Sequence, residues 1–284
     1  EGIVATRHYG TAKYYDMLAN HTDGHFLQIL RDVSKNPMMG QYLSSLKNTK
    51  ATLDNQGNII IAPDENYARE IMQLFSIGLL HKHPDGSLIL DENGLPSQTY
   101  DNDGITELAR VFTGWSFSKR AGSQASGYPE ENNTNFFQNN GPLYFQASWE
   151  NPMKIFGSYH DNQEKTLFGQ TLAAGQNGYQ DLNDATAILD SHPNSGPFIA
   201  RLLIQRLVTS NPSAGYIYRV GKVMSDNNGG TDGQMKKVVK AILLDYEARS
   251  LTNVENVGYG KQKEPMLRYL QLMRALDSKS QLSL

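Results

Sequence analysis

Five ionisable residues carry the chemistry that this sequence could perform: Glu65, Glu70, Arg110, His160 and Asp161. Carboxylates and imidazoles are ligands for zinc, manganese or iron, and the same groups transfer protons in acid–base catalysis without a metal. Glu70, His160 and Asp161 form the candidate metal set, so a divalent metal is the cofactor that this set would hold. All five are candidate catalytic residues if folding brings them to one cleft.

The same residues also fit a structural role. Glu65 and Glu70 are five positions apart, which separates them by about 140° around an undistorted helix, so both cannot bind one ion. Arg69 follows Glu65 by four residues, where the two side chains can pair, and Arg110 can neutralise either glutamate. In this interpretation the charges form a buried polar network, and His160 caps a loop.

A second set of candidates lies in residues 118–152, a segment rich in Gly, Asn, Ser and Gln with scattered aromatic residues. Tyr128, Tyr144 and Trp149 are the candidate ligand-binding residues. Aromatic rings stack on sugars or peptides and amides hydrogen-bond to them, so such a surface would suit either ligand. The alternative is that the aromatic residues pin a long irregular loop onto the body of the protein.

Other familiar sites are weak or missing. The run from His81 to Asp85 superficially resembles a metal-binding His-x-His-x-Asp string, but it follows a helix and enters a turn, so an exposed helix exit is expected. The sequence has no Gly-x-Ser-x-Gly elbow, phosphate-binding loop, dinucleotide fingerprint or His-Glu-x-x-His. The absence of cysteine excludes disulfides, thiolate zinc sites and a cysteine nucleophile.

Helices must position most of these candidates. From Asp64 to Gly78, the residues Tyr67, Ile71, Leu74 and Phe75 make one apolar stripe at helical spacing. Similar signals predict helices over 11–20, 24–34, 37–47, 64–78, 102–117, 163–174, 180–191, 194–210, 213–226, 231–247 and 264–277.

The remaining signals are extended or irregular. Ile59 to Ile61 predict a short extended segment, and the turn residues on both sides of Leu88 to Leu90 predict a small hairpin. The fold class is therefore mainly α: a single multi-helix domain over residues 1–284, with a small β-hairpin and the long loop or insertion at 118–152.

The charge and hydrophobicity of the chain limit the kinds of partner that it is expected to bind. The net charge of −3 and the isoelectric point near 6.2 give no electrostatic case for binding nucleic acid or an acidic membrane surface. No run of about 18 apolar residues exists, so no membrane span is expected in this chain.

Several unusual motifs follow one another along the chain. The first motifs are Glu65 to Glu70, Leu74 to Gly78 and Ala109 to Trp115. Later motifs are Phe156 to Asp161 with Lys165 to Gly169, then His192 to Leu202, and finally Lys263 to Pro265. In this order they resemble the large bacterial family known as domain of unknown function 1800. The resemblance covers nearly the whole chain, and several unusual motifs in order are far more specific than one alone.

The resemblance implies a setting but no reaction. Family members commonly carry export signals, and they have a further N-terminal portion with a Trp-and-His motif. We therefore expect this chain to be a fragment of a longer exported protein, periplasmic, outer-surface or extracellular. Two functions stay open: a structural or binding component of a surface assembly with a protein partner at the cell surface or envelope, or an exported hydrolase-type enzyme using the Glu/Arg/His/Asp residues.

Overall fold

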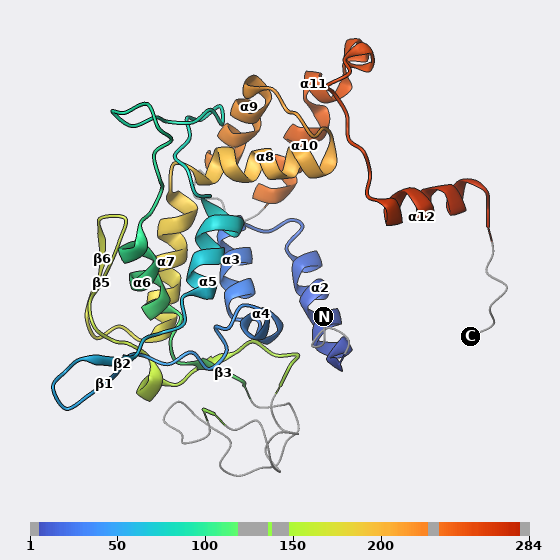
Figure 1. Cartoon of the computed structure of the whole chain (residues 1–284). Coiled ribbons are helices and arrows are strands. Elements are labelled where there is room, and N and C mark those ends of the chain that lie inside the picture. Colours follow the sequence, from blue (N-terminus) through green and yellow to red (C-terminus); the bar gives the residue numbers. More distant parts are fainter. Residues whose placement is uncertain (1–5, 119–135, 138–147, 227–232, 279–284) are drawn as a thin grey trace.

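The computed structural model describes residues 6–118, 136–137, 148–226 and 233–278. Helices dominate the regular structure of these ranges, which confirms the prediction of a mainly helical single domain (Figure 1). The α-helices are α2 (His8–Asn20), α3 (Phe26–Ser34), α4 (Pro37–Tyr42), α5 (Asn66–Glu70), α6 (Asn102–Val111), α7 (Gly178–Ser191), α8 (Ser195–Leu207), α9 (Ala214–Ser225), α10 (Gln234–Leu244), α11 (Tyr246–Arg249) and α12 (Pro265–Ala275). The shorter helical segments are a π-helix, η1 (Ile71–Ser76), and two 3-10 helices, η3 (Gly157–Tyr159) and η4 (Leu251–Glu255).

Side-chain caps explain where several helices begin. The Asn36 side chain accepts a hydrogen bond from the backbone N–H of Met38, and Pro37 takes the first helical position of α4. Asp101 caps α6 in the same way, by accepting from Gly104. Such caps satisfy backbone N–H groups that have no partner within the helix.

The first motif helix differs from the expected continuous helix over 64–78. After α5 it continues as a π-helix, η1 (Ile71–Ser76), in which the Ser76 hydroxyl donates to the Ile71 carbonyl oxygen at 2.6 Å. The wider π turn rotates the following residues, so Leu74 is exposed although the α-helical stripe had placed it inside. The segment ends as expected at Gly78, where φ is +74° and a Cβ atom would meet the ring of Phe198.

Short antiparallel pairs of strands join the helices. The pairs are β1 (Thr52–Leu53) with β2 (Ile59–Ile61), β3 (Trp115–Ser116) with β4 (Lys154–Ile155), and β5 (Lys165–Leu167) with β6 (Gln170–Leu172). Residues 79–99 form a ribbon whose bridges include Lys82 with Leu88 and Leu90 with Pro96, in agreement with the hairpin expected around 88–90.

The helix expected over 163–174 is wrong, because these residues form the β5–β6 hairpin. Its turn residues, Phe168 and Gly169, have φ angles of +50° and +75°. Two consecutive left-handed residues make a tight hairpin turn whose twist matches that of the strands.

Most of segment 118–152 lies outside the described residues, including Tyr128 and Tyr144. Two described parts of it contact the body. Phe136 is fully buried and stacks on Tyr159, with 4.2 Å between ring centroids. Trp149 packs against Phe117, with 4.6 Å between the ring centroids.

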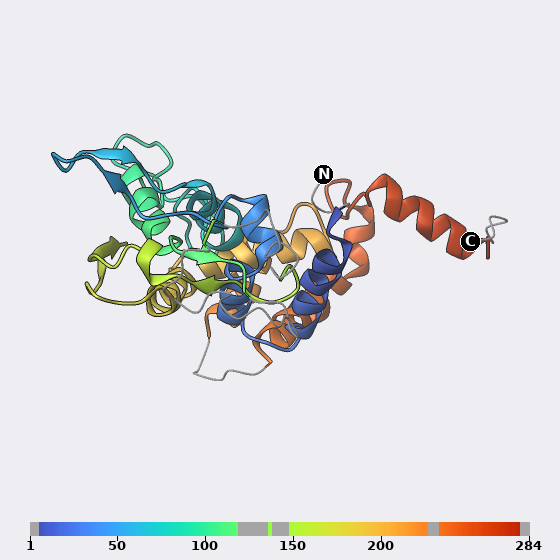
Figure 2. The same ribbon diagram turned by 90° about the horizontal axis from the view of Figure 1, so that it is seen from below.

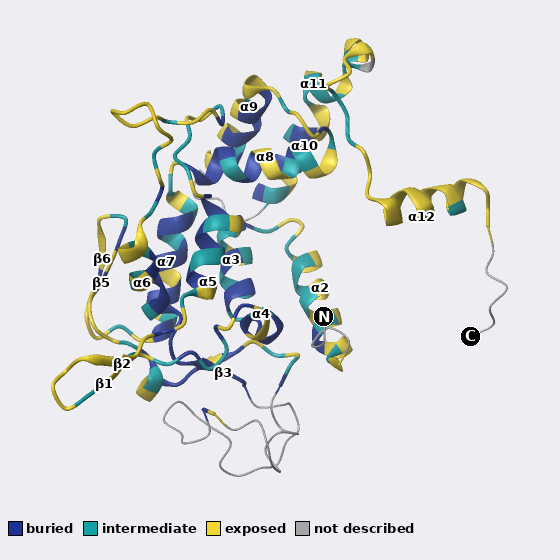
Figure 3. Ribbon diagram, viewed as in Figure 1, coloured by how far each residue is buried: buried dark blue, intermediate teal, exposed yellow. Residues whose placement is uncertain are grey.

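The core runs through the helical body, from α3, α5 and α6 to α7 and on to the packed helices α8, α9 and α10 (Figure 3). Helix α12 differs: it contains no buried residue, and Figures 1 and 2 show it lying apart from the body. Of the helices in the described ranges, none has the length and apolar character needed to cross a membrane.

Candidate functional site

Glu65 lies at the start of α5 and contacts α6. Its carboxylate accepts a hydrogen bond from the Thr106 hydroxyl at 2.9 Å and from Arg69 at 3.5 Å. The Glu65 and Arg69 side chains are both about two-fifths exposed. The pairing expected from their i, i+4 spacing is therefore present, as a weak surface ion pair.

Glu70 lies at the junction between α5 and the π-helix. Its Oε2 atom is buried and accepts no hydrogen bond from any described residue, and the same holds for the Tyr100 hydroxyl. Burial raises the pKa of Tyr100, the Arg69 charge lowers it in part, and the Glu70 charge raises it. Glu70 thus lies near Tyr100 and Arg69, and no hydrogen bond joins it to Arg110, His160 or Asp161.

Arg110 and Asp161 belong to two different sequence motifs and form an ion pair with each other. Arg110 projects from α6 and donates to both oxygens of Asp161, at 2.9 and 3.2 Å, in a bidentate pair. It also donates to Glu107, one turn earlier, at 2.7 Å. Glu107 accepts in addition from the backbone N–H of Thr166 in β5. One guanidinium therefore joins α6 to the loop after η3 and to the β5–β6 hairpin.

His160 lies beside this pair and is buried. Its Nδ1 contacts the carbonyl oxygen of Thr113 at 3.0 Å, and its Nε2 contacts Asp181 Oδ2 at 3.1 Å. The close fit extends to Gly114, where a Cβ atom would lie 2.8 Å from the His160 backbone nitrogen. With both ring nitrogens engaged, His160 holds the Thr113–Gly114 turn against α7.

Lys165 completes the network from the first position of β5. Although it is a lysine, only 1% of its side chain is exposed. Its ammonium group donates to the carbonyl oxygens of Asp161 at 2.5 Å and Gln163 at 2.9 Å, and it contacts the Asp181 carboxylate at 2.6 Å. These three partners match the three donors of an ammonium group. Burial of this charge is tolerable because it is fully paired.

The residues Glu107, Arg110, His160, Asp161, Lys165 and Asp181 are called the motif network from here on. Burial raises the pKa of Asp161, but hydrogen bonds from Arg110 and from the Gln163 backbone, with the charges of Arg110 and Lys165, hold it below its usual value. The hydrogen bond to Asp161 raises the pKa of Arg110. A proton-transfer catalyst works best with a pKa near the operating pH. The pairing with Arg110 lowers the pKa of Asp161 and so moves it further from a neutral operating pH.

The five candidate catalytic residues therefore fall into separate places. Arg110 and Asp161 bond directly, and His160 joins them through Asp181 and Lys165. Glu65 lies at the start of α5, where it contacts Thr106 on another stretch of α6, and Glu70 is not bonded to the network. Within the described ranges, no three His, Asp or Glu side chains are grouped so as to hold a metal ion. The candidate metal set, Glu70, His160 and Asp161, is therefore not brought together as one group in the described part of the chain.

Lys165, Asp181 and Glu107 belong to the network but were not among the sequence candidates. A lysine in a polar segment and an aspartate in the first turn of a helix are normally exposed, so neither gives a signal by type. The available signal was the spacing of Lys165 and Leu167, two positions apart on β5, because it places the lysine on the same face as a buried leucine.

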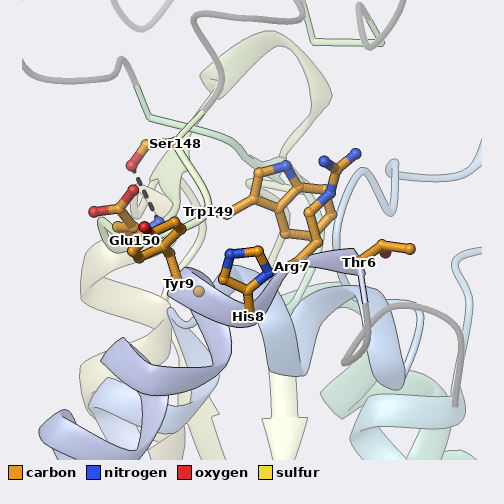
Figure 4. A pocket seen from close by; sticks show the side chains of 8 residues that line it. Thr6, Arg7, His8, Tyr9, Ser148, Trp149 and Glu150 are labelled. Atoms are coloured by element: carbon orange, nitrogen blue, oxygen red, sulfur yellow. Dashed lines mark hydrogen bonds between the residues drawn. The ribbon is translucent and has the colours of Figure 1, made fainter. Parts of the chain in front are cut away.

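Trp149, the described member of the predicted ligand-binding set, lines a pocket of about 320 Å³ (Figure 4). Arg7 lies over its indole ring, 5.1 Å from the centroid. His8 and Tyr9, at the start of α2, contribute further rings, and Glu150 closes one side. The pocket offers stacking surfaces and charges of both signs, and none of the motif network lines it.

Comparisons with known proteins complete these observations. No curated protein and no solved structure matches the chain. A family model matches residues 3–283, which is nearly the whole chain. The protein therefore belongs to the family described as protein of unknown function DUF1800.

Proposed function

We propose that this protein is a non-catalytic binding component of an assembly at the cell surface or envelope. The observation that carries the proposal is the pairing of Arg110, His160 and Asp161 inside the body, where they connect α6, α7 and the β5–β6 hairpin. Their chemistry is used to hold the fold together. The pocket around Trp149, in contrast, is formed by other residues.

The β1–β2 hairpin supplies a surface for a protein partner. Leu53, Ile59, Ile60 and Ile61 are all more than half exposed on it. Figure 1 shows the hairpin extending from the helical body. Adjacent exposed aliphatic residues are uncommon on proteins without a partner, and a two-stranded hairpin has free backbone edges to which another strand can bond. We call residues 52–61 the isoleucine hairpin.

Location at the envelope rests on the family resemblance. Cross-linking in cells that produce the protein tests location and partner together. We expect a discrete cross-linked product in the envelope or secreted fraction. It should be lost when Ile59, Ile60 and Ile61 are all replaced by Ser, with the melting temperature unchanged because the side chains are exposed.

Leu251→Ser is the matched control, since Leu251 is 84% exposed and lies outside the hairpin. The control should keep the cross-linked product. A product that survives in the triple variant, or its absence from the unmodified protein, would refute the proposed contact. Recovery of the protein only in the cytosolic fraction would refute the location.

A second candidate is the acid–base or metal-dependent enzyme, which one observation favours. Glu70 has a buried carboxylate oxygen without a described hydrogen-bond donor, and a π-helix, often found at functional sites, follows it directly. Metal analysis of natively purified protein, with Glu70→Ala and His160→Ala variants, tests this candidate. Stoichiometric metal that is lost in both variants would replace the binding proposal.

A further inference from the structure

A second pocket, of about 330 Å³, lies beside α11 and shares no lining residue with the Trp149 pocket. It is bounded by the start of α9, by α11 and by the loop that follows. Its lining residues are Asn211, Ser213, Tyr246, Glu247, Ser250, Thr252, Asn253, Asn256, Gly258 and Tyr259. We call it the tyrosine–amide pocket. Its volume is at the small end of the range for ligand sites, about 300–1,000 Å³.

The lining is unusual in composition. It holds amides, hydroxyls, two phenols and one carboxylate, and no aliphatic side chain. No lysine or arginine lines it, so it does not suit a phosphate or another anion. The single carboxylate, Glu247, already accepts from the Ser213 backbone at 3.0 Å and from the Ser213 hydroxyl, and Arg219 lies 3.9 Å away. The pocket is therefore close to neutral.

Tyr246 provides an aromatic ring that is exposed yet held in place. The Arg219 guanidinium lies 4.4 Å from the ring centroid, and Arg219 is fixed in turn by two hydrogen bonds to Asp245, at 2.7 and 2.8 Å. The ring is 68% exposed. Tyr246 lines the pocket, whereas Arg219 does not.

The pocket walls are also connected to one another. Tyr259 and Asn253 both donate to the Glu247 carbonyl oxygen, at 2.7 and 2.5 Å. Asn211 donates to the Gly258 carbonyl oxygen at 2.9 Å. These bonds link α11, the loop after it and the segment before α9. A site that is ordered before binding loses less conformational entropy when a ligand arrives.

From these features we propose that the tyrosine–amide pocket binds a neutral saccharide. Sugar rings present C–H faces that stack on a tyrosine ring, and hydroxyl groups that exchange hydrogen bonds with amides and hydroxyls. The site binds rather than hydrolyses, because glycosidases use two carboxyl groups flanking the bond. Here Asp245 is occupied by Arg219, which leaves Glu247 alone. The inference is independent of the proposed function, since the pocket shares no residue with the isoleucine hairpin.

Saturation-transfer NMR tests the proposal with four free sugars as probes: glucose, galactose, mannose and N-acetylglucosamine. At least one should receive saturation from the unmodified protein and from Tyr246→Phe, which keeps the ring. Tyr246→Ala should abolish the signal. Tyr42→Ala is the matched control, because Tyr42 is 70% exposed on α4, away from the pocket, and its loss should leave the signal intact.

A second variant tests the pocket independently, in case Tyr246→Ala loses the signal only because it folds poorly. Thr252 is exposed on the pocket rim, so Thr252→Trp fills the pocket without disturbing the core and should also abolish the signal. Absence of transfer to all four sugars, or transfer that persists in both Tyr246→Ala and Thr252→Trp, would overturn the inference. Neither result bears on the isoleucine hairpin, so failure here is distinguishable from failure of the proposed function.

Discussion

Two arginine–aspartate pairs with nearly the same bonding lie in different parts of this protein. Arg110 holds Asp161 within the motif network, and Arg219 holds Asp245 beside the tyrosine–amide pocket, each through two hydrogen bonds. In both aspartates burial raises the pKa, but the arginine hydrogen bonds and charge bring it below its usual value. The pairs differ in what surrounds them.

The Arg110 side chain is 16% exposed and joins segments far apart in the sequence, whereas Arg219 is 36% exposed and lies against Tyr246, an exposed ring. The first pair stabilises the body. The second orients a surface that a ligand can reach. Residue type alone therefore does not separate a structural ion pair from one that supports a binding site; burial and the neighbouring pocket do.

The largest expected effect is at the most buried part of the motif network. Asp181→Ala leaves Lys165 and His160 buried without their shared carboxylate, and should lower the free energy of unfolding by about 3–5 kcal/mol. Urea unfolding followed by tryptophan fluorescence measures the change. Asp184→Ala, an exposed position in the same helix, should change it by less than about 0.5 kcal/mol. Equal stability of the two variants would show that the network contributes nothing.

The second largest loss of stability is expected at the Arg110–Asp161 pair. Arg110→Ala leaves Asp161 and Glu107 without their guanidinium partner and should cost about 3 kcal/mol. Arg69→Ala breaks the half-exposed pair with Glu65 and should cost about 0–1 kcal/mol. Both are measured by the same urea titration. If the Arg69 variant is as unstable as the Arg110 variant, burial is not what distinguishes these pairs.

The sequence predicted the helices more accurately than it predicted the network. Helix starts could be predicted from local signals such as Asn36-Pro37, because caps act within a few residues. The β5–β6 hairpin was missed because Phe168 is a poor marker of a left-handed turn, even beside Gly169. The π-helix after Glu70 was missed because its hydrogen bonds are set by packing of the whole domain.

Arg110 and Asp161 were both among the sequence candidates, and the structure pairs them directly, but their further partners were not predictable. Lys165 on β5 pairs with Asp181 on α7, 16 positions later in the sequence. No helical or strand periodicity in the sequence indicates such a contact. Glu65 and Glu70 were grouped with the network by residue type, and the structure places them elsewhere. Long-range pairing is decided by tertiary structure.

A smaller effect is expected at the second arginine. Arg219→Ala should lower the free energy of unfolding by about 1 kcal/mol, since this pair is more exposed than the first and solvent screens it. The same change should weaken the sugar signal in saturation-transfer NMR, because Tyr246 loses the cation that orients it. A variant as unstable as Arg110→Ala, or one with an unchanged sugar signal, would remove the distinction between the two pairs.

The pH dependence of the free energy of unfolding should distinguish the two arginine–aspartate pairs from His192. Asp161 and Asp245 have lowered pKa values, so their contributions are present above about pH 4 and are lost only as the pH falls further. Burial, and then the charge of His81, lowers the pKa of His192 to about 4.

Between about pH 6.5 and 4 the unfolded chain therefore binds a proton at His192 that the folded chain does not bind. The free energy of unfolding should decrease as the pH is lowered through this window. His192→Gln should flatten this part of the urea-stability profile. An unchanged slope in the variant would place the proton uptake at another group.

The central claim is that the ionisable residues of the motif network stabilise the fold. A double-mutant cycle on Arg110 and Asp161 tests it most directly, with urea unfolding of Arg110→Ala, Asp161→Ala and the double variant. The account predicts a coupling energy of about 2 kcal/mol, with the double variant less destabilised than the sum of the single changes. A coupling energy near zero, with all three variants as stable as the unmodified protein, would contradict it and return Arg110 and Asp161 to the list of candidate catalytic residues.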